Sequence, residues 1–187
     1  MAKYIPTSTI DLALNQIKKS DYESICSQQP TTYFEACNPE MWVAEAAYVV
    51  GDISKAPTDN NMAYECTTGG TSGASEPAWS EVQDGTFTDG TVTWKAHDNY
   101  SLVTAELLEA DKTLADIANG RSLTFAEKTM VLSHRAGTVT HTAFINSADL
   151  QLEAVTVSVT SVAADNDIMA GRNTILGAVT IPLTCGV

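Results

Sequence analysis

The sequence predicts a mainly β protein: an antiparallel, β-sandwich-like host domain with a short N-terminal helix, plus a small inserted all-β module. Beyond residue 100, segments rich in Thr and Val are separated by turn residues about every ten positions, which is typical of antiparallel sandwiches. All three tryptophans fall within residues 40–98. A module this short buries little aliphatic core, so large aromatic side chains must supply most of its buried apolar area.

The 187 residues are expected to form two domains: a discontinuous host domain of residues 1–39 and 99–187, and the inserted module of residues 40–98. Insertion is tolerated where the two connections lie close together at an exposed loop. Residues 38–39 and 97–99 have the turn-prone composition that such a junction needs. We expect the host domain to anchor the protein and the module to project from it.

One amphipathic helix is expected near the N-terminus. Apolar residues recur there at the i, i+3, i+4, i+7 spacing of one helix face, at Ile10, Ala13, Leu14 and Ile17. A hydroxyl group of Ser8 or Thr9 is expected to cap the first turn. Residues 20–21 end the helix, and a strand is expected over residues 22–27.

The module contains two strand-like pieces, residues 63–67 and 91–94. They enclose a loop of Gly, Ser, Thr, Asp and Pro, the residue types that turn a chain. A third strand-like piece lies upstream at residues 42–52. These pieces predict a small sheet with its own core.

The second half of the host domain is expected to be β throughout. Strands are predicted at residues 100–107, 120–126, 130–132, 137–145, 150–160 and 177–183. The tail of the first could instead be a helical turn, and residues 106–118 fit neither the helical nor the strand period. Alternation places Leu123 and Phe125 on one face. Pro182 implies an edge or end position for the last strand.

The charge balance argues against a nucleic-acid partner. The formal net charge is −13, and residues 40–98 contain ten acids against two lysines, whereas phosphate binding needs clustered Lys and Arg. No apolar run approaches the roughly 20 residues that span a bilayer, and the N-terminus lacks the apolar segment of a signal peptide. The expectation is a soluble, unexported protein with no membrane insertion.

The cysteines give no sign of a metal site. Cys26, Cys37, Cys66 and Cys185 are scattered without a CxxC pattern or a Cys/His cluster, so no metal or cofactor is expected. In a reducing cytoplasm these cysteines are expected to be free thiols. A disulfide between Cys26 and Cys37 is the alternative. Residues 165–167 lack the further ligands and the Gly of a calcium loop, which favours a polar turn.

No catalytic residue is expected. Ser72 lies between glycine-bearing turns, but a nucleophile elbow needs a following helix, and a Pro-containing loop follows here. His141, in a Thr-rich strand, is expected to be a half-buried sheet residue. Glu76, Asp84 and Asp89 would be the candidates for a glycosidase pair, but acids on loops are usually only solvated. The sequence therefore predicts a protein that is not an enzyme.

The module carries three motifs in order: W-(x)5-YxxGD, YxCTxxGTSGxxEPxW and DGTVTW. This order resembles a small β module common in bacteriophage virion proteins, especially head and tail decoration proteins and fibre proteins. The matching residues are Trp42, Tyr48, Gly51, Asp52, Tyr64, Cys66, Thr67, residues 70–73, Glu76, Pro77, Trp79 and residues 89–94.

The host domain carries further motifs: ICSQQPTTYFEA at residues 25–36, GRSLT at 120–124, TVTHTAFIN at 138–146 and TIP at 180–182. With the module removed, this sequence is similar to a family of phage structural proteins in which a helix, a strand and a turn precede a β region. Residues 126–135 and 164–173 depart from the family pattern.

These resemblances imply a non-enzymatic virion structural protein, made in the cytoplasm of the host bacterium and located in the virion. Its expected role is decoration of the capsid surface, with a neck or tail adaptor or fibre-attachment protein as the alternative. The implied partners are other virion proteins, either the major capsid protein or neck and tail proteins. A symmetric homo-oligomer, a trimer or another ring, is also expected.

A further alternative is an accessory adsorption protein that binds host-surface glycans, because the module's opening also resembles carbohydrate-binding modules of the chitin-binding type. That resemblance makes the aromatic rings the candidate glycan contacts: Trp79, Trp42, Tyr48, Tyr64 and Trp94. Trp79 is the best single candidate because it follows Pro77 in a loop. The opposing interpretation is that these rings form the core. A third hypothesis places a depolymerase site on the module.

Overall fold

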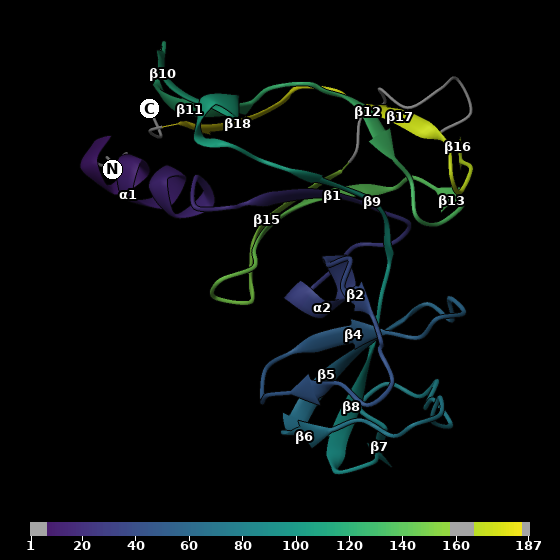
Figure 1. Cartoon of the computed structure of the whole chain (residues 1–187). Helices are drawn as coiled ribbons and strands as arrows, with labels where there is room; N and C mark the ends of the chain where they lie inside the picture. Colours follow the sequence, from purple (N-terminus) through teal and green to yellow (C-terminus); the bar gives the residue numbers. More distant parts are fainter. Residues whose placement is uncertain (1–6, 158–166, 185–187) are drawn as a thin grey trace. The chain divides into compact units, whose positions relative to one another are not determined.

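The computed structural model describes residues 7–157 and 167–184 (Figure 1). The chain is mainly β, with several antiparallel sheets and one short N-terminal helix, which confirms the predicted fold class. Its contacts define two compact units: Met1–Tyr33 with Ser101–Val187 form unit 1, and Phe34–Tyr100 form unit 2. Unit 2 thus begins earlier and ends later than the module expected at residues 40–98.

Helix α1 spans Thr7–Ile17 and confirms the predicted helix. Leu14 is fully buried on its apolar face, whereas Leu12 on the other side is 73% exposed. The expected cap is wrong, because Ser8 and Thr9 lie inside the first helical turn. At the other end, the hydroxyl of Ser20 donates a hydrogen bond to the carbonyl of Ile17 at 2.7 Å.

A four-stranded antiparallel sheet forms the centre of unit 1. Its order is β15 (Gln151–Val157), β14 (His141–Asn146), β1 (Tyr22–Cys26) and β9 (Ser101–Glu106). These strands confirm the predictions at residues 22–27 and 100–107. The prediction at 150–160 is confirmed up to Val157, and residues 158–160 lie outside the described residues. The single strand predicted at 137–145 is divided, because residues 137–138 pair in another sheet and only residues from His141 onward belong to β14. His141 is half-buried in β14, as expected.

A second, three-stranded sheet has the order β10 (Lys112–Ile117), β11 (Gly120–Phe125) and β18 (Val179–Thr184). Pro182 lies on the edge strand β18, which confirms the edge position predicted for it. Leu123 and Phe125 are both fully buried. The ambiguous stretch after residue 106 contains a short 3-10 helix, η1 (Glu109–Asp111), followed by β10.

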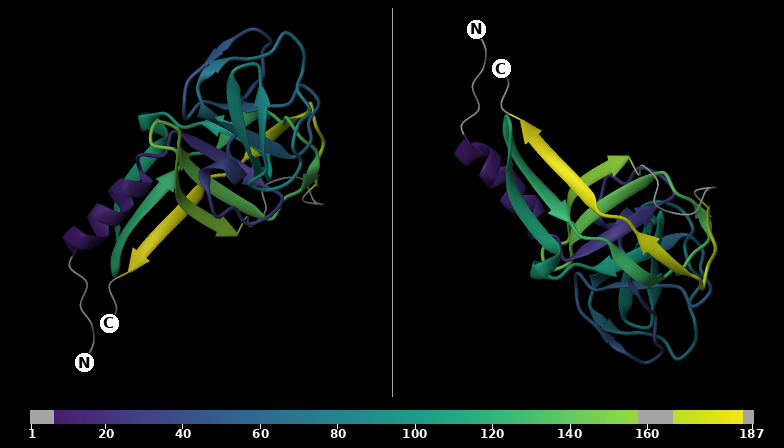
Figure 2. Two further views of the ribbon diagram at one scale, coloured as in Figure 1. Left: turned by 90° about the horizontal axis from the view of Figure 1, so that it is seen from below. Right: turned by 90° about the horizontal axis from the view of Figure 1, so that it is seen from above.

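Two hydrophobic clusters stabilise unit 1. One contains Ile25, Leu102, Val103, Ala105, Val139, Ile168 and Leu176 and packs against β12 (Lys128–Leu132) through Val131. The other contains Ile10, Leu14, Leu107, Leu123, Phe125 and Phe144. In both views of Figure 2, α1 lies alongside β11 and β18, whose side chains complete this second cluster. Two short pairs, β12–β17 (Asn173–Leu176) and β13 (Gly137–Thr138)–β16 (Asp167–Ile168), complete the described strands of unit 1.

Unit 2 is built on a five-stranded sheet with the order β2 (Glu40–Met41), β4 (Ile53–Lys55), β5 (Met62–Thr68), β8 (Val92–Asp98) and β7 (Thr86–Asp89). A short helix, α2 (Tyr33–Ala36), precedes it. Strands β5 and β8 confirm the two predicted pieces. The third piece, residues 42–52, is mostly loop, because only β3 (Ala47–Tyr48) is a strand and it pairs with β6 (Gly70–Thr71).

Cys26, Cys37 and Cys66 are buried thiols, in agreement with the expected thiol form. Cys185 and residues 165–166 lie outside the described residues. Within residues 7–157 and 167–184, no helix is long and apolar enough to cross a membrane.

Candidate functional site: the aromatic cluster of unit 2

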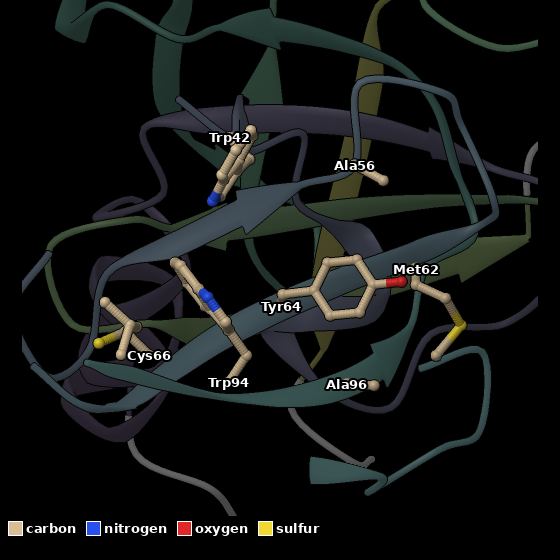
Figure 3. Close-up of a cluster of buried hydrophobic side chains, with 8 residues drawn as sticks. Trp42, Ala56, Met62, Tyr64, Cys66, Trp94 and Ala96 are labelled. Carbon is tan, nitrogen blue, oxygen red and sulfur yellow. The ribbon is translucent and has the colours of Figure 1, made fainter. Parts of the chain in front are cut away.

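All five candidate glycan-contact residues belong to one cluster, which is the hydrophobic core of unit 2. Trp42, Tyr64 and Trp94 are buried, the last two with no exposed surface. Figure 3 shows these rings together with Met62, Cys66 and Ala96. Tyr48 and Trp79 are half-buried and pack against the same cluster. Tyr64 and Trp94 therefore present no ring face on which a sugar could stack.

The Trp79 ring is the centre of the aromatic contacts. Its centroid lies 4.6 Å from that of Tyr64, 5.5 Å from that of Phe87 and 6.1 Å from that of Trp42. Edge-to-face and tilted arrangements at these distances are favourable for aromatic pairs. Trp79, Tyr48 and Phe87 are the partly exposed rings that pack against the cluster, so an external ligand can reach them.

Asp89 connects three separate segments of unit 2. Its Oδ2 accepts hydrogen bonds from the indole nitrogens of Trp42 at 2.7 Å and Trp94 at 3.3 Å, and its Oδ1 accepts one from the backbone N–H of Gly73 at 2.7 Å. The carboxylate is buried. Buried polar groups need such partners, so Asp89 is used to hold the core and the loop together.

Ser72 has a similar structural role. Its hydroxyl donates to the carbonyl of Val43 at 2.8 Å and accepts from the N–H of Ala46 at 3.0 Å, which ties the 43–46 loop to the 70–73 segment. This agrees with the interpretation of Ser72 as a turn residue. The oxygen that a nucleophile would need is engaged in these bonds.

The glycines of the motifs allow close backbone approach. Gly90 has φ +60°, and a Cβ there would lie 2.3 Å from the carbonyl oxygen of Thr71. A Cβ on Gly70 would lie 2.3 Å from the hydroxyl of Thr91. That hydroxyl also accepts the N–H of Thr71 at 2.8 Å. The loop that carries the GTSG motif therefore packs directly against the loop that carries the DGT motif.

The other loop acids also have local partners. Glu76 accepts the indole N–H of Trp79 at 2.6 Å, and Asp84 forms an ion pair with Lys95 at 2.7 Å. The hydrogen bond from Lys95 holds the pKa of Asp84 below its usual value. Burial raises the pKa of the Tyr64 hydroxyl, which donates to the carbonyl of Ser80 at 3.0 Å.

Unit 1 contains a buried carboxylate, that of Glu23, which the sequence analysis did not single out. Glu23, on β1, is 1% exposed, and neither carboxylate oxygen has a hydrogen-bond partner within the described residues. Its neighbours across the sheet are Ala105 and Phe144, which belong to the two hydrophobic clusters. Burial raises the pKa of Glu23 to about 8, partly opposed by the positive charge of Lys128. A single Glu in a strand has no sequence signal that distinguishes this position.

Two of the three histidines have local partners that the structure shows. His97 Nε2 lies 3.0 Å from the Glu65 carboxylate, and its ring stacks on Phe34 at a centroid distance of 3.9 Å. His134 Nε2 lies 3.0 Å from the carbonyl of Ser101. In the part of the chain that the structure describes, no three His, Cys, Asp or Glu side chains are grouped as metal ligands.

The fold and the candidate site together define a mainly β protein in which the motif residues of unit 2 build its core and loops. Comparison of the chain with protein-family models, curated proteins and solved structures found no match.

Proposed function

We propose that this chain is a non-enzymatic structural protein of a bacteriophage virion, most simply a decoration protein of the capsid surface. In this role unit 1 docks on the particle and the acidic unit 2 faces outward. The proposal rests on the resemblances of the two sets of motifs to phage structural proteins.

One structural observation supports a role without chemistry. The polar motif residues of unit 2 that resemble catalytic groups, Asp89 and Ser72, are occupied by hydrogen bonds that hold its loops. A module built in this way needs only to be rigid and soluble. The net negative charge of residues 40–98 favours solubility.

The partners of unit 1 would be other virion proteins and further copies of this chain in a symmetric ring. Strands β15 and β9 are the outer strands of the four-stranded sheet. In β9, which is mostly buried, the carbonyl of Leu102 already accepts the backbone N–H groups of His134 and Arg135, so β15 is the edge available to another chain. An exposed edge strand can pair with a strand of another chain through backbone hydrogen bonds. Strand addition is therefore the contact that we propose for attachment.

Cryo-electron microscopy of intact particles tests this role. Density for this chain repeated over the capsid, with unit 2 outward, is the expected result. Density only at the neck or tail would replace decoration with the adaptor or fibre-attachment role. Particles without density for this chain would contradict a virion role altogether.

Glycan binding is a second candidate function, because Trp79 keeps part of its ring exposed and lies in a loop beside Glu76. Retention of the full chain on immobilised host polysaccharide tests it. Trp79→Ala should abolish retention, whereas Val82→Ala, at an exposed apolar residue of the same loop, should not. If the unmutated protein is not retained, glycan binding is excluded as the role.

A further inference from the structure

Unit 1 contains an ion pair between Lys128, at the start of β12, and Asp111, at the end of η1. Each of the two side chains is 19% exposed. In every other ion pair that a lysine or arginine forms within the described residues, the acid is at least 35% exposed. The Lys128–Asp111 pair is therefore the best shielded of these pairs.

A β-bulge turns Lys128 toward the core. Between Lys128 and Val131, three residue steps on β12 match two steps on β17. Residues that pair with the same face of β17 share that face, so Lys128 lies on the side of Val131, which packs against a core cluster. Within the bulge, Met130 has a φ of +57°, which bulky residues rarely adopt. The strand thus adopts an unfavourable backbone conformation at the place where it directs a lysine inward.

The buried carboxyl of Glu23 lies within the electrostatic range of Lys128. Neither of its oxygens has a hydrogen-bond partner within the described residues, and the residues opposite it on the two adjacent strands, Ala105 and Phe144, are apolar. The charge of Lys128 lowers the pKa of Glu23, but burial outweighs this effect and raises the pKa to about 8. Glu23 is therefore a neutral carboxylic acid at neutral pH, able to donate and to accept a proton.

We propose that Lys128 and Asp111 form an amide cross-link, with the buried Glu23 as the acid that exchanges protons with the pair. The Nζ atom of Lys128 forms a bond with Cγ of Asp111, and the bond from Cγ to Oδ1 breaks. Two of the three ammonium protons leave with this oxygen as one molecule of water. The step therefore balances without an oxidant or a co-reactant, and it is a modification of the chain by its own residues.

The pair is ionic at rest, because the hydrogen bond from Lys128 lowers the pKa of Asp111. An ammonium group is not a nucleophile, so Lys128 must lose a proton before its nitrogen attacks. The neutral Glu23 carboxyl supplies this exchange: its carbonyl oxygen takes a proton from the nitrogen, and its O–H gives one to the leaving oxygen. The backbone N–H of Leu108, 2.7 Å from Oδ2 of Asp111, stabilises the charge on the oxygen that remains.

The fold favours the amide because it has already brought the amine and the carboxyl together. Bond formation then costs little further translational freedom. The flexible four-carbon stem of Lys128 allows its nitrogen to move between Asp111 and Glu23. Since η1 precedes β10 and β12 follows β11, the cross-link would join the two ends of the β10–β11 hairpin.

Intact-mass spectrometry of the purified full chain tests the cross-link. The expected mass is that of the sequence less one molecule of water. Digestion with trypsin should then give one branched peptide, in which residues 96–112 are joined to residues 122–135. This peptide locates the bond at Asp111 and Lys128 and separates it from loss of water elsewhere in the chain.

Three variants assign the roles. Lys128→Arg keeps the positive charge and should have the full mass, because a guanidinium does not form this amide. Lys95→Arg is the matched control: Lys95 pairs with the exposed Asp84, so this variant should still lose one water. Glu23→Gln keeps the shape of the side chain but does not titrate, and should form the cross-link about 10²–10⁴-fold more slowly. Amide NMR dispersion shows whether each variant is folded.

The proposal is overturned if the folded, unmutated protein keeps the full mass of its sequence. Loss of water without the branched peptide, or loss of water in Lys128→Arg, would also overturn it. Formation of the cross-link by folded Glu23→Gln at the rate of the unmutated protein would overturn the role given to Glu23. None of these masses depends on whether the chain is part of a particle, so this inference and the virion role stand or fall separately.

Discussion

At Asp89 a single carboxylate accepts hydrogen bonds from two indole rings and one backbone N–H of unit 2. Asp89→Ala would leave these buried donors unsatisfied, so we expect unit 2 to lose about 2 to 4 kcal/mol of stability. All three tryptophans lie in unit 2, so denaturant unfolding followed by tryptophan fluorescence measures this unit specifically.

The exposed Glu81 provides the control for that measurement, because Glu81→Ala removes a carboxylate from the same unit without leaving a buried donor. It should unfold within about 0.5 kcal/mol of the unmutated protein. Equal unfolding midpoints for Asp89→Ala and Glu81→Ala would contradict the role given to Asp89.

Glu23 makes the stability of unit 1 dependent on pH. Its ordinary pKa is 4.5, and burial raises it to about 8 in the folded protein. Between these values the folded state holds one more proton than the unfolded state, so the free energy of unfolding falls as pH rises. The contribution is fully present below pH 4.5 and is lost as pH rises through about 8, by at most about 1.4 kcal/mol per pH unit.

Glu23→Gln should flatten this slope, because the amide does not ionise, and should make unit 1 more stable than the unmutated unit above about pH 8. Calorimetric unfolding across this pH range measures the effect. Glu106→Gln, at an exposed position of the adjacent strand β9, is the control and should keep the original slope. The same slope in Glu23→Gln as in the unmutated protein would show that Glu23 does not titrate in this range.

The candidate site was predictable in its residues but not in their roles. A module of this size needs aromatic core, which argued for rings inside the fold, and the structure places Tyr64 and Trp94 there. The role of Asp89 as acceptor for Trp42 and Trp94 had no sequence signal, because the bond to Trp42 joins residues 47 positions apart. Such partners meet only when the sheet forms.

Helix α1 is held to unit 1 by one apolar face rather than by its own propensity, as is usual for a helix of 11 residues. Leu14→Ala should therefore destabilise unit 1 by about 2 to 5 kcal/mol, since it leaves a cavity in a core cluster. Leu12→Ala, on the same helix but at a 73% exposed position, should change stability by less than about 0.5 kcal/mol. Calorimetry compares the two; similar losses would mean that the apolar face does not anchor the helix.

Helices and strands whose apolar residues recur at a regular spacing were predictable from the sequence. Strands that depend on pairing with a neighbouring strand were not. The alternation in β11 and the helical spacing in α1 are local, and both elements form where expected. Strand β10 has no clear alternation and exists because Leu114 pairs with Leu123 in the neighbouring strand. Residues 42–52 contain residues favourable to strands, but Ser72 bonds the backbone of Val43 and Ala46, and this part of the segment is loop.

The molecule as a whole consists of two units with separate cores, and every residue of the unit 2 cluster lies within Phe34–Tyr100. We therefore expect the fragment of residues 34–100 to fold by itself. Dispersed amide resonances in its NMR spectrum and a cooperative loss of tryptophan fluorescence on unfolding would show this. A spectrum without dispersion would mean that unit 2 needs unit 1 for its stability.

From the order of its residues alone, this protein was predictable as mainly β, with one amphipathic helix, an aromatic-rich inserted segment and an acidic surface. These properties follow from local periodicity, turn chemistry and composition, which need no knowledge of the partner strands. Only the tertiary structure decided that Asp89 bonds two indoles, that Glu23 is buried without a partner, and that Lys128 meets Asp111. Each of these depends on residues far apart in the chain, whose meeting is set by sheet register and packing.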